Sequence, residues 1–376
     1  MRIAHVSDCF LPRTGGIESQ VSDLAAQQAA AGHDVHVLTA TLGADGERGG
    51  VVELARGVQV HRLGTRLPFD LPVNPVQARL LRSALDSLQP DVVHVHAGVV
   101  SPFAFDGARL AVARGLPTAI TWHCMLDGMV PSLRAAVRAT RWRSTAAALS
   151  AVSRAAAQRV GQVFEVPVEV VPNGMDLAAW APAAGGDVRA EGSPVHLVST
   201  MRLAPRKRAV PLVELVAAAA RRLPAGALQL TIIGDGPTRR RVEQAVASHG
   251  LEAVVRLTGR LSREEVRAAY ADADVFLAPA ELEAFGIAAL EARTAGLAIV
   301  ARSGTGIEEF VVDGTDGLLV ADDAEMTEAI VHLVRDERLL AGIRSHNHAV
   351  RPAFGWERVL SAAESEYRRA ATLAGL

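Results

Sequence analysis

DVFLAPAELEAFGIAALE, which spans residues 274–291, contains a short apolar run, an acidic loop and the beginning of a helix. The run Val275–Ala278 has the length of a buried strand in a parallel sheet. Gly286 opens a helical pattern, with Glu283 before the helix and Glu291 inside it. A strand, a glycine-containing loop and a helix N-terminus together form a place where α/β sheets bind ligands.

The groups at this corner suit a phosphorylated sugar. The free amides of Gly286 and Ile287 at the helix N-terminus would attract a phosphate. The carboxylates of Glu283 and Glu291 suit the hydroxyls of a sugar or a ribose. A nucleotide sugar carries both kinds of group, so the other parts of such a site are expected elsewhere in the chain.

Composition limits the class of protein. A chain of 376 residues is about twice the usual domain length, so two domains are expected. A balance of 39 Lys+Arg against 41 Asp+Glu argues against nucleic-acid binding by bulk charge. The two cysteines, Cys9 and Cys124, exclude a disulfide framework and indicate a reducing compartment. Neither a signal-peptide pattern nor an apolar run of about 18 residues is present, so we expect a soluble, cytoplasmic protein.

Strand-sized apolar runs alternate with helical patterns along the chain, which predicts the α/β class with doubly wound parallel sheets. In the first half the expected strands are Arg2–Ser7, His33–Thr39, Val51–Leu54, Val58–Leu63, Val92–His96, Pro117–Thr121, Ala147–Val152 and Val168–Val171. In the second half they are Val195–Thr200, Leu228–Ile233, Val254–Thr258, Val275–Ala278, Leu297–Ala301 and Leu318–Val320. The longer expected helices are Ile17–Ala31, Pro75–Leu88, Phe103–Arg114, Leu133–Thr145, Glu325–His346 and Trp356–Leu373.

An Ala-, Gly- and Pro-rich segment at residues 179–194 interrupts this alternation and is expected to be a linker. It would separate an N-terminal, acceptor-side Rossmann-like domain (1–178) from a C-terminal, nucleotide-sugar-binding one (195–352). A last helix lies within 353–376. A central cleft faced by the two domains is the natural place for a site.

Two glycines, Gly15 and Gly16, follow the first strand, where their bare amides can face a ligand. The dinucleotide fingerprint G-x-G-x-x-G is absent, and Glu18 follows at once. A plain strand-to-helix turn explains the two glycines equally well.

His123 lies just past the strand that ends at Thr121, at the carboxyl end of the predicted sheet. Ligands bind at this end in open α/β folds. No Cys or His stands at the spacing of a zinc site. A lone histidine at a strand end commonly has a structural role. The position of His123 at the carboxyl end of the sheet nevertheless favours a role in the site.

Two cations, Arg202 and Lys207, follow the strand that ends at Thr200 and precede a helix. A planar guanidinium, a compact ammonium and a helix dipole together make a good diphosphate clamp. The alternative is that this segment is simply a basic loop exposed to solvent. We assign Arg206 and Arg208 to the solvated face of that loop.

Other motifs point less clearly to chemistry. Residues 234–237 (GDGP) form a glycine-flanked turn after a strand, and residues 303–309 (SGTGIEE) follow another. Asp272 and Asp274 form a D-x-D, which holds a divalent metal in some sugar transferases. This pair stands at the start of a core strand, far from its carboxyl end. We therefore predict no metal site and interpret Asp272 as a turn residue.

The predicted helix at residues 133–145 is basic, without an acidic residue, and carries a tryptophan. The residues concerned are Arg134, Arg138, Arg141, Trp142 and Arg143. Such a helix can bind an anionic membrane surface, although an exposed helix face is the simpler interpretation.

Together these motifs resemble the retaining glycosyltransferases of family 4, which have the GT-B fold. The matching pieces, in the family's order, are Gly15–Glu18, His123, Pro172–Asp176, Arg202 with Lys207, Gly234–Pro237 and Glu283–Glu291. They span nearly the whole chain, and the two glutamates with the Arg/Lys pair are the specific part. Thr305 departs from the pattern, because the family often has a second glycine there, and the role of its loop stays open.

The resemblance implies a role for each group. Glu291 would hold the nucleotide ribose and Glu283 a donor-sugar hydroxyl, while His123 would lie by the transferring sugar. The expected catalytic residues are His123, Arg202, Lys207 and Glu283. The expected donor-binding residues are Gly16, Arg202, Lys207, Gly286, Ile287 and Glu291. The expected acceptor-side residues are Gly15, Glu18 and His123.

The activity implied is retaining transfer of a hexosyl unit from a nucleotide-diphosphate sugar, UDP-linked more commonly than GDP-linked. The acceptor would be a hydroxyl of a small molecule or a lipid, because the chain's opening looks like relatives that act on inositol phospholipids and like others that act on soluble acceptors. No metal or other cofactor is expected, since Arg and Lys can stabilise the leaving diphosphate. The last helix is expected to cross back onto the first domain.

Two alternatives share the fold and the donor site. One is an epimerase acting on a nucleotide sugar, and the other is a non-catalytic subunit that binds one. The expected location is cytoplasmic, with peripheral contact at the inner membrane face through the basic helix 133–145.

Overall fold

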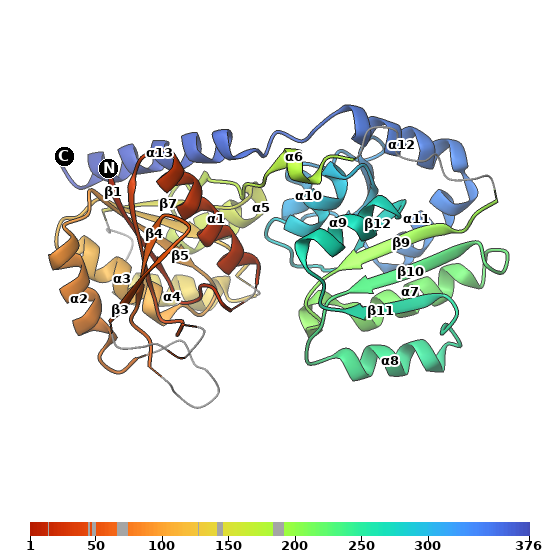
Figure 1. The fold of residues 1–376 in the computed structure, drawn as a ribbon, viewed down its shortest axis with the longest axis horizontal. Helices are drawn as coiled ribbons and strands as arrows, with labels where there is room; N and C mark the ends of the chain where they lie inside the picture. The colour runs from red at the N-terminus through yellow and green to blue at the C-terminus, as the bar shows by residue number, and fades with distance from the viewer. Residues whose placement is uncertain are drawn as a thin grey trace. The chain divides into compact units, whose positions relative to one another are not determined.

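The computed structural model describes residues 1–13, 15–43, 46, 50–65, 74–126, 128–140, 146–182 and 192–376. The chain forms two compact units (Figure 1). The first unit is Met1–Gly174 with Phe354–Leu376, and the second unit is Met175–Ala353. The second unit therefore begins before the expected linker, of which residues 183–191 lie outside the described ranges.

The first unit is built on an eight-stranded sheet with the order β3-β4-β2-β1-β5-β6-β7-β8. Its strands are β1 (Arg2–Ser7), β2 (Asp34–Thr39), β3 (Val51–Ala55), β4 (Val58–Arg62), β5 (Val92–Ala97), β6 (Thr118–Trp122), β7 (Ala147–Ala151) and β8 (Glu169–Val170). The central strands β5 and β6 are buried throughout and β1 is buried after Arg2, as parallel strands covered on both faces must be.

The edge strand β3 runs antiparallel to β4, whereas the other strand pairs of this sheet run parallel. Only Arg56 and Gly57 connect the two strands, and a parallel connection needs a dozen or more residues. Both residues have positive φ, 54° and 79°. This is the backbone that a tight two-residue hairpin requires.

Helices cover the first sheet. They are α1 (Gly16–Ala30), α2 (Gln77–Leu88), α3 (Pro102–Val112), α4 (Val130–Thr140), α5 (Arg154–Phe164) and α13 (Trp356–Leu373). The last of these returns from the end of the chain and packs against β6 and β7 (Figure 1). Its Ala363, Tyr367 and Ala370 share one apolar cluster with Ile3 and Val92.

The second unit contains a six-stranded, wholly parallel sheet with the order β11-β10-β9-β12-β13-β14. Its strands are β9 (Val195–Thr200), β10 (Leu228–Ile233), β11 (Val255–Gly259), β12 (Val275–Ala278), β13 (Ala298–Arg302) and β14 (Gly317–Val320). Its helices are α6 (Leu177–Trp180), α7 (Ala209–Ala220), α8 (Arg239–Ser248), α9 (Arg263–Ala271), α10 (Ile287–Thr294), α11 (Asp323–Arg335) and α12 (Glu337–Ala349), with short 3-10 helices at Pro205–Lys207 and Gly306–Glu309. A large apolar core joins one face of the sheet, through alternate residues of its strands, to α7, α8, α11 and α12.

The helix expected at residues 325–346 is two helices, α11 and α12. Asp336 separates them with non-helical backbone, and its carboxylate accepts a hydrogen bond from the amide of Leu339 at 2.9 Å. Aspartate is a favoured N-cap, so this side chain starts a new helix instead of continuing the old one.

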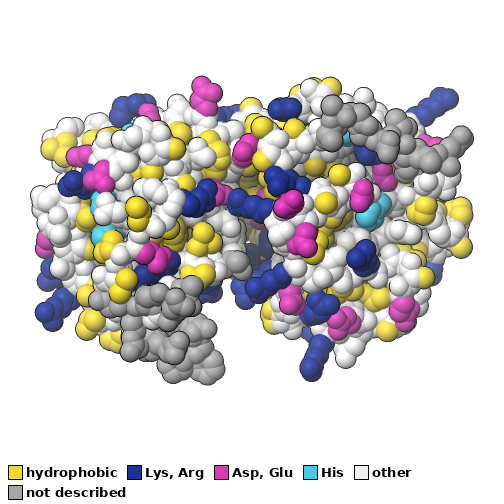
Figure 2. All heavy atoms as spheres, in the orientation of Figure 1, with side chains coloured by type: hydrophobic (Ala, Val, Ile, Leu, Met, Phe, Trp, Pro, Cys, Tyr) yellow, Lys and Arg dark blue, Asp and Glu magenta, His cyan; other side chains and the backbone are white. Residues whose placement is uncertain are grey.

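The surface matches the near-zero net charge. Figure 2 shows basic and acidic side chains interspersed on its visible face. Within the described ranges, no helix combines the length and the apolar character needed to cross a lipid bilayer.

Candidate functional site

Residues 274–291 form a strand, a loop and a helix, as predicted: β12 ends at Ala278 and α10 begins at Ile287. Gly286 joins loop and helix with a φ of 87°, a conformation that favours glycine. A Cβ atom there would lie 2.6 Å from Cγ1 of Ile307, so close packing also requires glycine. The amides of Gly286 and Ile287 donate to no acceptor among the described residues. They are available to an anion at the helix N-terminus.

The structure brings Lys207 and Glu283 together. Lys207 ends the short helix after β9, and Glu283 lies in the loop after β12, the neighbouring strand in the sheet. Nζ of Lys207 donates to Oε2 of Glu283 at 2.5 Å. Both side chains are about one-fifth exposed (21% and 20%), so they remain accessible to a ligand.

Arg202 shares the loop with Lys207 but does not join this ion pair. Its side chain is exposed and makes no ion pair or hydrogen bond within the described part of the chain. Such a guanidinium is free to bind an incoming phosphate.

Glu291 lies in α10 and is half-buried, and its charge acts on the buried Tyr270. Tyr270 is fully buried, and its hydroxyl lies 2.9 Å from Oγ1 of Thr200 and 3.4 Å from the carbonyl of Ala288. Burial, together with the charge of Glu291, raises the pKa of Tyr270 well above its ordinary value. Tyr270 therefore stays a neutral group that ties the end of β9 to α10. This role of Tyr270 was not predicted from the sequence.

Arg208 corrects a prediction, because it is not part of a solvated face. It contacts Glu281 and Asp323, both at 2.6 Å, and Arg302 also pairs with Asp323. These contacts hold the loops that follow β9 and β12 beside the end of β13 and the start of α11. Arg206 is exposed, as predicted.

Glycines let the loops of the second unit stack at the carboxyl end of its sheet. A Cβ on Gly234 would lie 1.9 Å from the carbonyl oxygen of Met201, and one on Gly306 would lie 2.0 Å from that of Ala284. The amide of Gly306 donates to the carbonyl of Glu283 at 2.8 Å. The loop that carries Glu283 is thereby held in place.

Thr305 has a structural task. Its hydroxyl donates to the carbonyl of Arg302 at 2.8 Å and accepts from the amide of Ile307 at 3.4 Å. Glu308 accepts from the amide of Gly304 at 2.6 Å, so its carboxylate closes the same turn.

Asp274 of the D-x-D motif is buried at the amino end of β12. Its carboxylate accepts hydrogen bonds from the amide of His196 at 2.9 Å and from Arg344 at 2.5 Å. This places it at the opposite end of the strand from Glu283 and gives it a structural role.

In the first unit, His123 follows β6 and is half-buried. Its Nε2 lies 3.0 Å from Nδ1 of His96. Burial lowers the pKa of His123 to about 4, so the imidazole is neutral at pH 7. A neutral imidazole offers one donor and one acceptor to its surroundings.

Gly15 and Gly16 lead into α1, which begins at Gly16. A Cβ on Gly15 would lie 2.3 Å from Oε2 of Glu18, whose side chain is buried beneath this turn. Glu18 lies 3.6 Å from Arg13. Asp8, the residue after β1, is also buried, and its burial was not predicted from the sequence.

The basic helix is α4, Val130–Thr140, and residues 141–145 of the predicted segment lie outside the described ranges. Arg134 is exposed, whereas Arg138 pairs with Glu165 of α5. Part of the basic charge is thus neutralised within the first unit.

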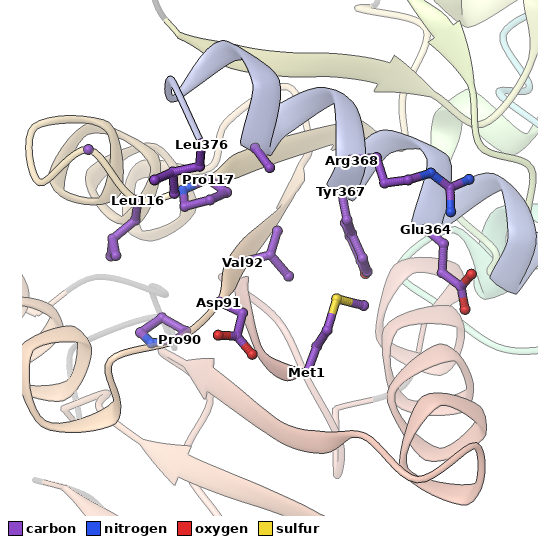
Figure 3. A pocket seen from close by; sticks show the side chains of 12 residues that line it. Met1, Pro90, Asp91, Val92, Leu116, Pro117, Glu364, Tyr367, Arg368 and Leu376 are labelled. Atoms are coloured by element: carbon purple, nitrogen blue, oxygen red, sulfur yellow. The ribbon is translucent and has the colours of Figure 1, made fainter.

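A pocket of about 460 Å³ lies at the opposite end of the first sheet, where its strands begin. Met1, Val92 and Pro117 line it at the amino ends of β1, β5 and β6, and Tyr367 of α13 projects into it (Figure 3). Ligands of parallel α/β sheets bind at the carboxyl ends, so we assign the candidate site to that end and not to this pocket.

The chain is similar to known proteins in sequence and in fold. The "Glycosyltransferase Family 4" model matches residues 14–179, and the "Glycosyl transferases group 1" model matches residues 188–348. A GDP-mannose-dependent alpha-(1-6)-phosphatidylinositol monomannoside mannosyltransferase of Mycolicibacterium smegmatis is 30% identical, over 90% of each chain. A GDP-mannose-dependent alpha-mannosyltransferase of Mycobacterium tuberculosis is 27% identical, over 91% of this chain and 90% of the relative. Sucrose-phosphate synthase from Thermosynechococcus elongatus has the same fold, with a TM-score of 0.76, 20% identity and 98% of each chain covered.

Proposed function

The chain belongs to the family 4 glycosyltransferases of the GT-B fold, and we propose that it transfers a hexosyl unit from a nucleotide-diphosphate sugar to a hydroxyl, with retention of configuration and without a metal. Two of its mannosyltransferase relatives depend on GDP-mannose. GDP-mannose is therefore the first candidate donor. UDP-sugars, which the sequence analysis favoured, are the second.

One observation carries this proposal: the Lys207–Glu283 ion pair lies at the same end of the same sheet as the N-terminus of α10. A diphosphate offers oxygens to Lys207 and to the amides of Gly286 and Ile287. Once a phosphate competes for the ammonium, the carboxylate of Glu283 becomes able to accept a sugar hydroxyl. The ion pair keeps both groups in position until the donor binds.

The chemistry follows from the charges. The bond between the anomeric carbon and the diphosphate oxygen breaks, and the negative charge of the leaving group is stabilised by Lys207, Arg202 and the helix amides. The acceptor hydroxyl attacks from the face that the diphosphate leaves. Its proton passes to the departing phosphate oxygen, so no separate base is required. Glu291 would bind the ribose of the nucleotide.

On the acceptor side we assign roles to residues of the first unit. His123 would contact the transferring sugar, with Gly16 near the phosphate and with Gly15 and Glu18 shaping the turn beside it. A relative acts on a phosphatidylinositol mannoside, so an inositol phospholipid is the first candidate acceptor, and a small polyol is the second. With a lipid acceptor, the exposed Arg134 of α4 would contact the anionic membrane surface.

The test is a panel of ligands measured by thermal shift: GDP-mannose, GDP, UDP-glucose, UDP-N-acetylglucosamine and UDP. A true donor at 100 times its Kd stabilises the folded state by about 2.7 kcal/mol. The best donor is then incubated in EDTA, alone and with each acceptor. We expect product only with an acceptor. An isomerised sugar from donor alone would indicate an epimerase, and activity lost in EDTA but restored by Mn²⁺ would contradict the metal-free mechanism.

A further inference from the structure

A line of hydrogen bonds leads from His123 into the core of the first unit. Nε2 of His123 lies 3.0 Å from Nδ1 of His96, and Nε2 of His96 lies 2.9 Å from Nδ1 of His5. Nε2 of His5 lies 2.7 Å from Oε1 of Gln28 on α1. His96, His5 and Gln28 are each at most 2% exposed, so the contacts among these three residues are shielded from water.

The last acceptor in the line sets the tautomer of every ring. Oε1 of Gln28 can only accept, so Nε2 of His5 carries the proton and its Nδ1 accepts. Burial lowers the pKa of all three histidines, so each ring is neutral and carries one N–H. Nε2 of His96 must then donate to His5, and Nε2 of His123 must donate to His96. Nδ1 of His123 is left with a lone pair.

A second arm starts from the other atom of the same amide and confirms its orientation. From Nε2 of Gln28 it passes through Tyr367, His94, Thr121 and Ser150, with 2.8 Å at each step, to the Ile120 carbonyl at 3.4 Å. A carbonyl cannot donate, so the protons of this arm all point away from Gln28. The amide nitrogen therefore faces Tyr367, and the amide oxygen faces His5.

A metal is the competing explanation for so many histidines. His5, His94 and His96 place one ring nitrogen each within 4.8 Å of one another. All six of their ring nitrogens, however, already have hydrogen-bond partners in the protein. An ion would have to break several of these buried contacts, so a hydrogen-bonded network explains the cluster better.

We propose that Gln28, His5 and His96 are positioning residues that hold His123 in the Nε2–H tautomer, so that Nδ1 accepts a hydrogen bond from a substrate hydroxyl. No group in the described chain donates to this Nδ1. A neutral ring with an exposed lone pair accepts from a hydroxyl and gives no attraction to a phosphate oxygen. The identity of the hydroxyl, on the donor sugar or on the acceptor, rests on the function proposed above, whereas the tautomer does not.

The tautomer can be read directly in the full chain labelled with ¹⁵N-histidine. Long-range ¹H–¹⁵N spectra separate the two ring nitrogens, and His123→Gln identifies the signals of residue 123. We expect His5, His96 and His123 all to carry Nε2–H. A proton on Nδ1 of His123, or signals of His5, His94 and His96 that shift together on addition of one equivalent of Zn²⁺, would overturn the proposal.

Variants of Gln28 test the cause. Gln28→Met keeps the length of the side chain but removes the amide, so His123 should become a mixture of tautomers. Gln28→Glu again offers only an acceptor to His5 and should restore Nε2–H. Gln27→Met, at a half-buried neighbour on the same helix, is the matched control and should change nothing. Unchanged spectra in a folded Gln28→Met protein, or a lost tautomer in Gln28→Glu, would refute the assignment.

Kinetics with GDP-mannose and the best acceptor then separate the two proposals. Loss of one oriented hydrogen bond should lower kcat/KM of Gln28→Met by about tenfold, and Gln28→Glu should recover most of it. Absence of turnover with any sugar nucleotide would refute the proposed function while the NMR result stood. An expected tautomer with unaltered kinetics in Gln28→Met would refute the role in substrate binding.

Discussion

Lys207 is the only lysine in the chain, and it lies where the candidate site needs a compact positive charge. Two nearby arginines are differently placed. Arg208 is paired with Glu281 and Asp323, and Arg206 is exposed to solvent. Only Arg202 remains to assist Lys207. In the proposed mechanism, the positive charge offered to a leaving diphosphate would therefore depend strongly on Lys207.

Lys207→Ala should lower kcat by about 10²- to 10³-fold, because it removes a preorganised donor from the leaving group. The melting temperature should change little, since the pair with Glu283 is partly exposed and such pairs contribute about 1 kcal/mol or less. Transfer rate and thermal unfolding are measured on the same preparation. Arg206→Ala is the control and should behave as wild type. A Lys207→Ala protein with near wild-type turnover would contradict the assigned role.

At the scale of elements, the candidate site depends on how loops at one end of the second sheet pack together. Gly286 directly precedes α10 and packs against Ile307, while Gly306 packs against Ala284. Each glycine allows backbone to approach where a side chain would not fit. The position of the α10 amides is therefore a result of loop packing and not of the helix alone.

Gly286→Ala and Gly304→Ala separate backbone strain from steric contact. Both glycines have positive φ (87° and 71°), so alanine costs about 1–2 kcal/mol at each. At Gly286 the new Cβ would also lie 2.6 Å from Ile307, whereas at Gly304 it would meet nothing within 4 Å. We expect the larger loss of stability, and weaker donor binding, only in Gly286→Ala. Equal midpoints in urea unfolding would show that the close approach is unimportant.

At the scale of the whole molecule, the first unit consists of two segments far apart in the chain. The Phe354–Leu376 segment completes a core begun by the first strand, with Tyr367 packed beside Ile3. A Cβ on Gly174 would lie 2.7 Å from Cε3 of Trp356, so the start of this segment also packs tightly. The first unit cannot complete its core until the last helix has been synthesised.

The buried histidines predict acid sensitivity of this unit. Burial lowers the pKa of His5, His61 and His123 from 6.5 to about 4, and it lowers the pKa of His94 and His96 well below 6.5. Below pH 6.5 these histidines bind protons in the unfolded chain but not in the folded chain. The free energy of unfolding therefore falls as the pH decreases toward 4.

Asp8 acts in the opposite direction. Burial raises its pKa from 3.8 to about 6, so its protonation favours the folded state as the pH falls. One carboxyl cannot offset five histidines, and we expect the melting temperature to decrease steadily from pH 7 to pH 4.5. Asp8→Asn should steepen that decrease, because it removes the opposing group. A flat profile in calorimetry would show that the histidines titrate freely in the folded protein.

The sequence predicted most elements because their signals are local. β9, β10, β12 and α13 have the predicted bounds, since a buried strand or an amphipathic helix is visible in the spacing of its own apolar residues. The family, the α/β class and the glycine turn before α10 were likewise predictable. The antiparallel direction of β3 was not predicted, because pairing depends on the turn that precedes β4 and not on the composition of the strand.

Sequence alone therefore determined the kind of protein and the residues that could bind a nucleotide sugar, because motif order and periodicity are properties of neighbouring residues. Tertiary structure decided which of those residues have partners. It joined Lys207 to Glu283, removed Arg208 from the solvent, and connected His123 through His5 to Gln28. These contacts link residues from 23 to 91 positions apart, and no local pattern records which of them the fold will bring within hydrogen-bond distance.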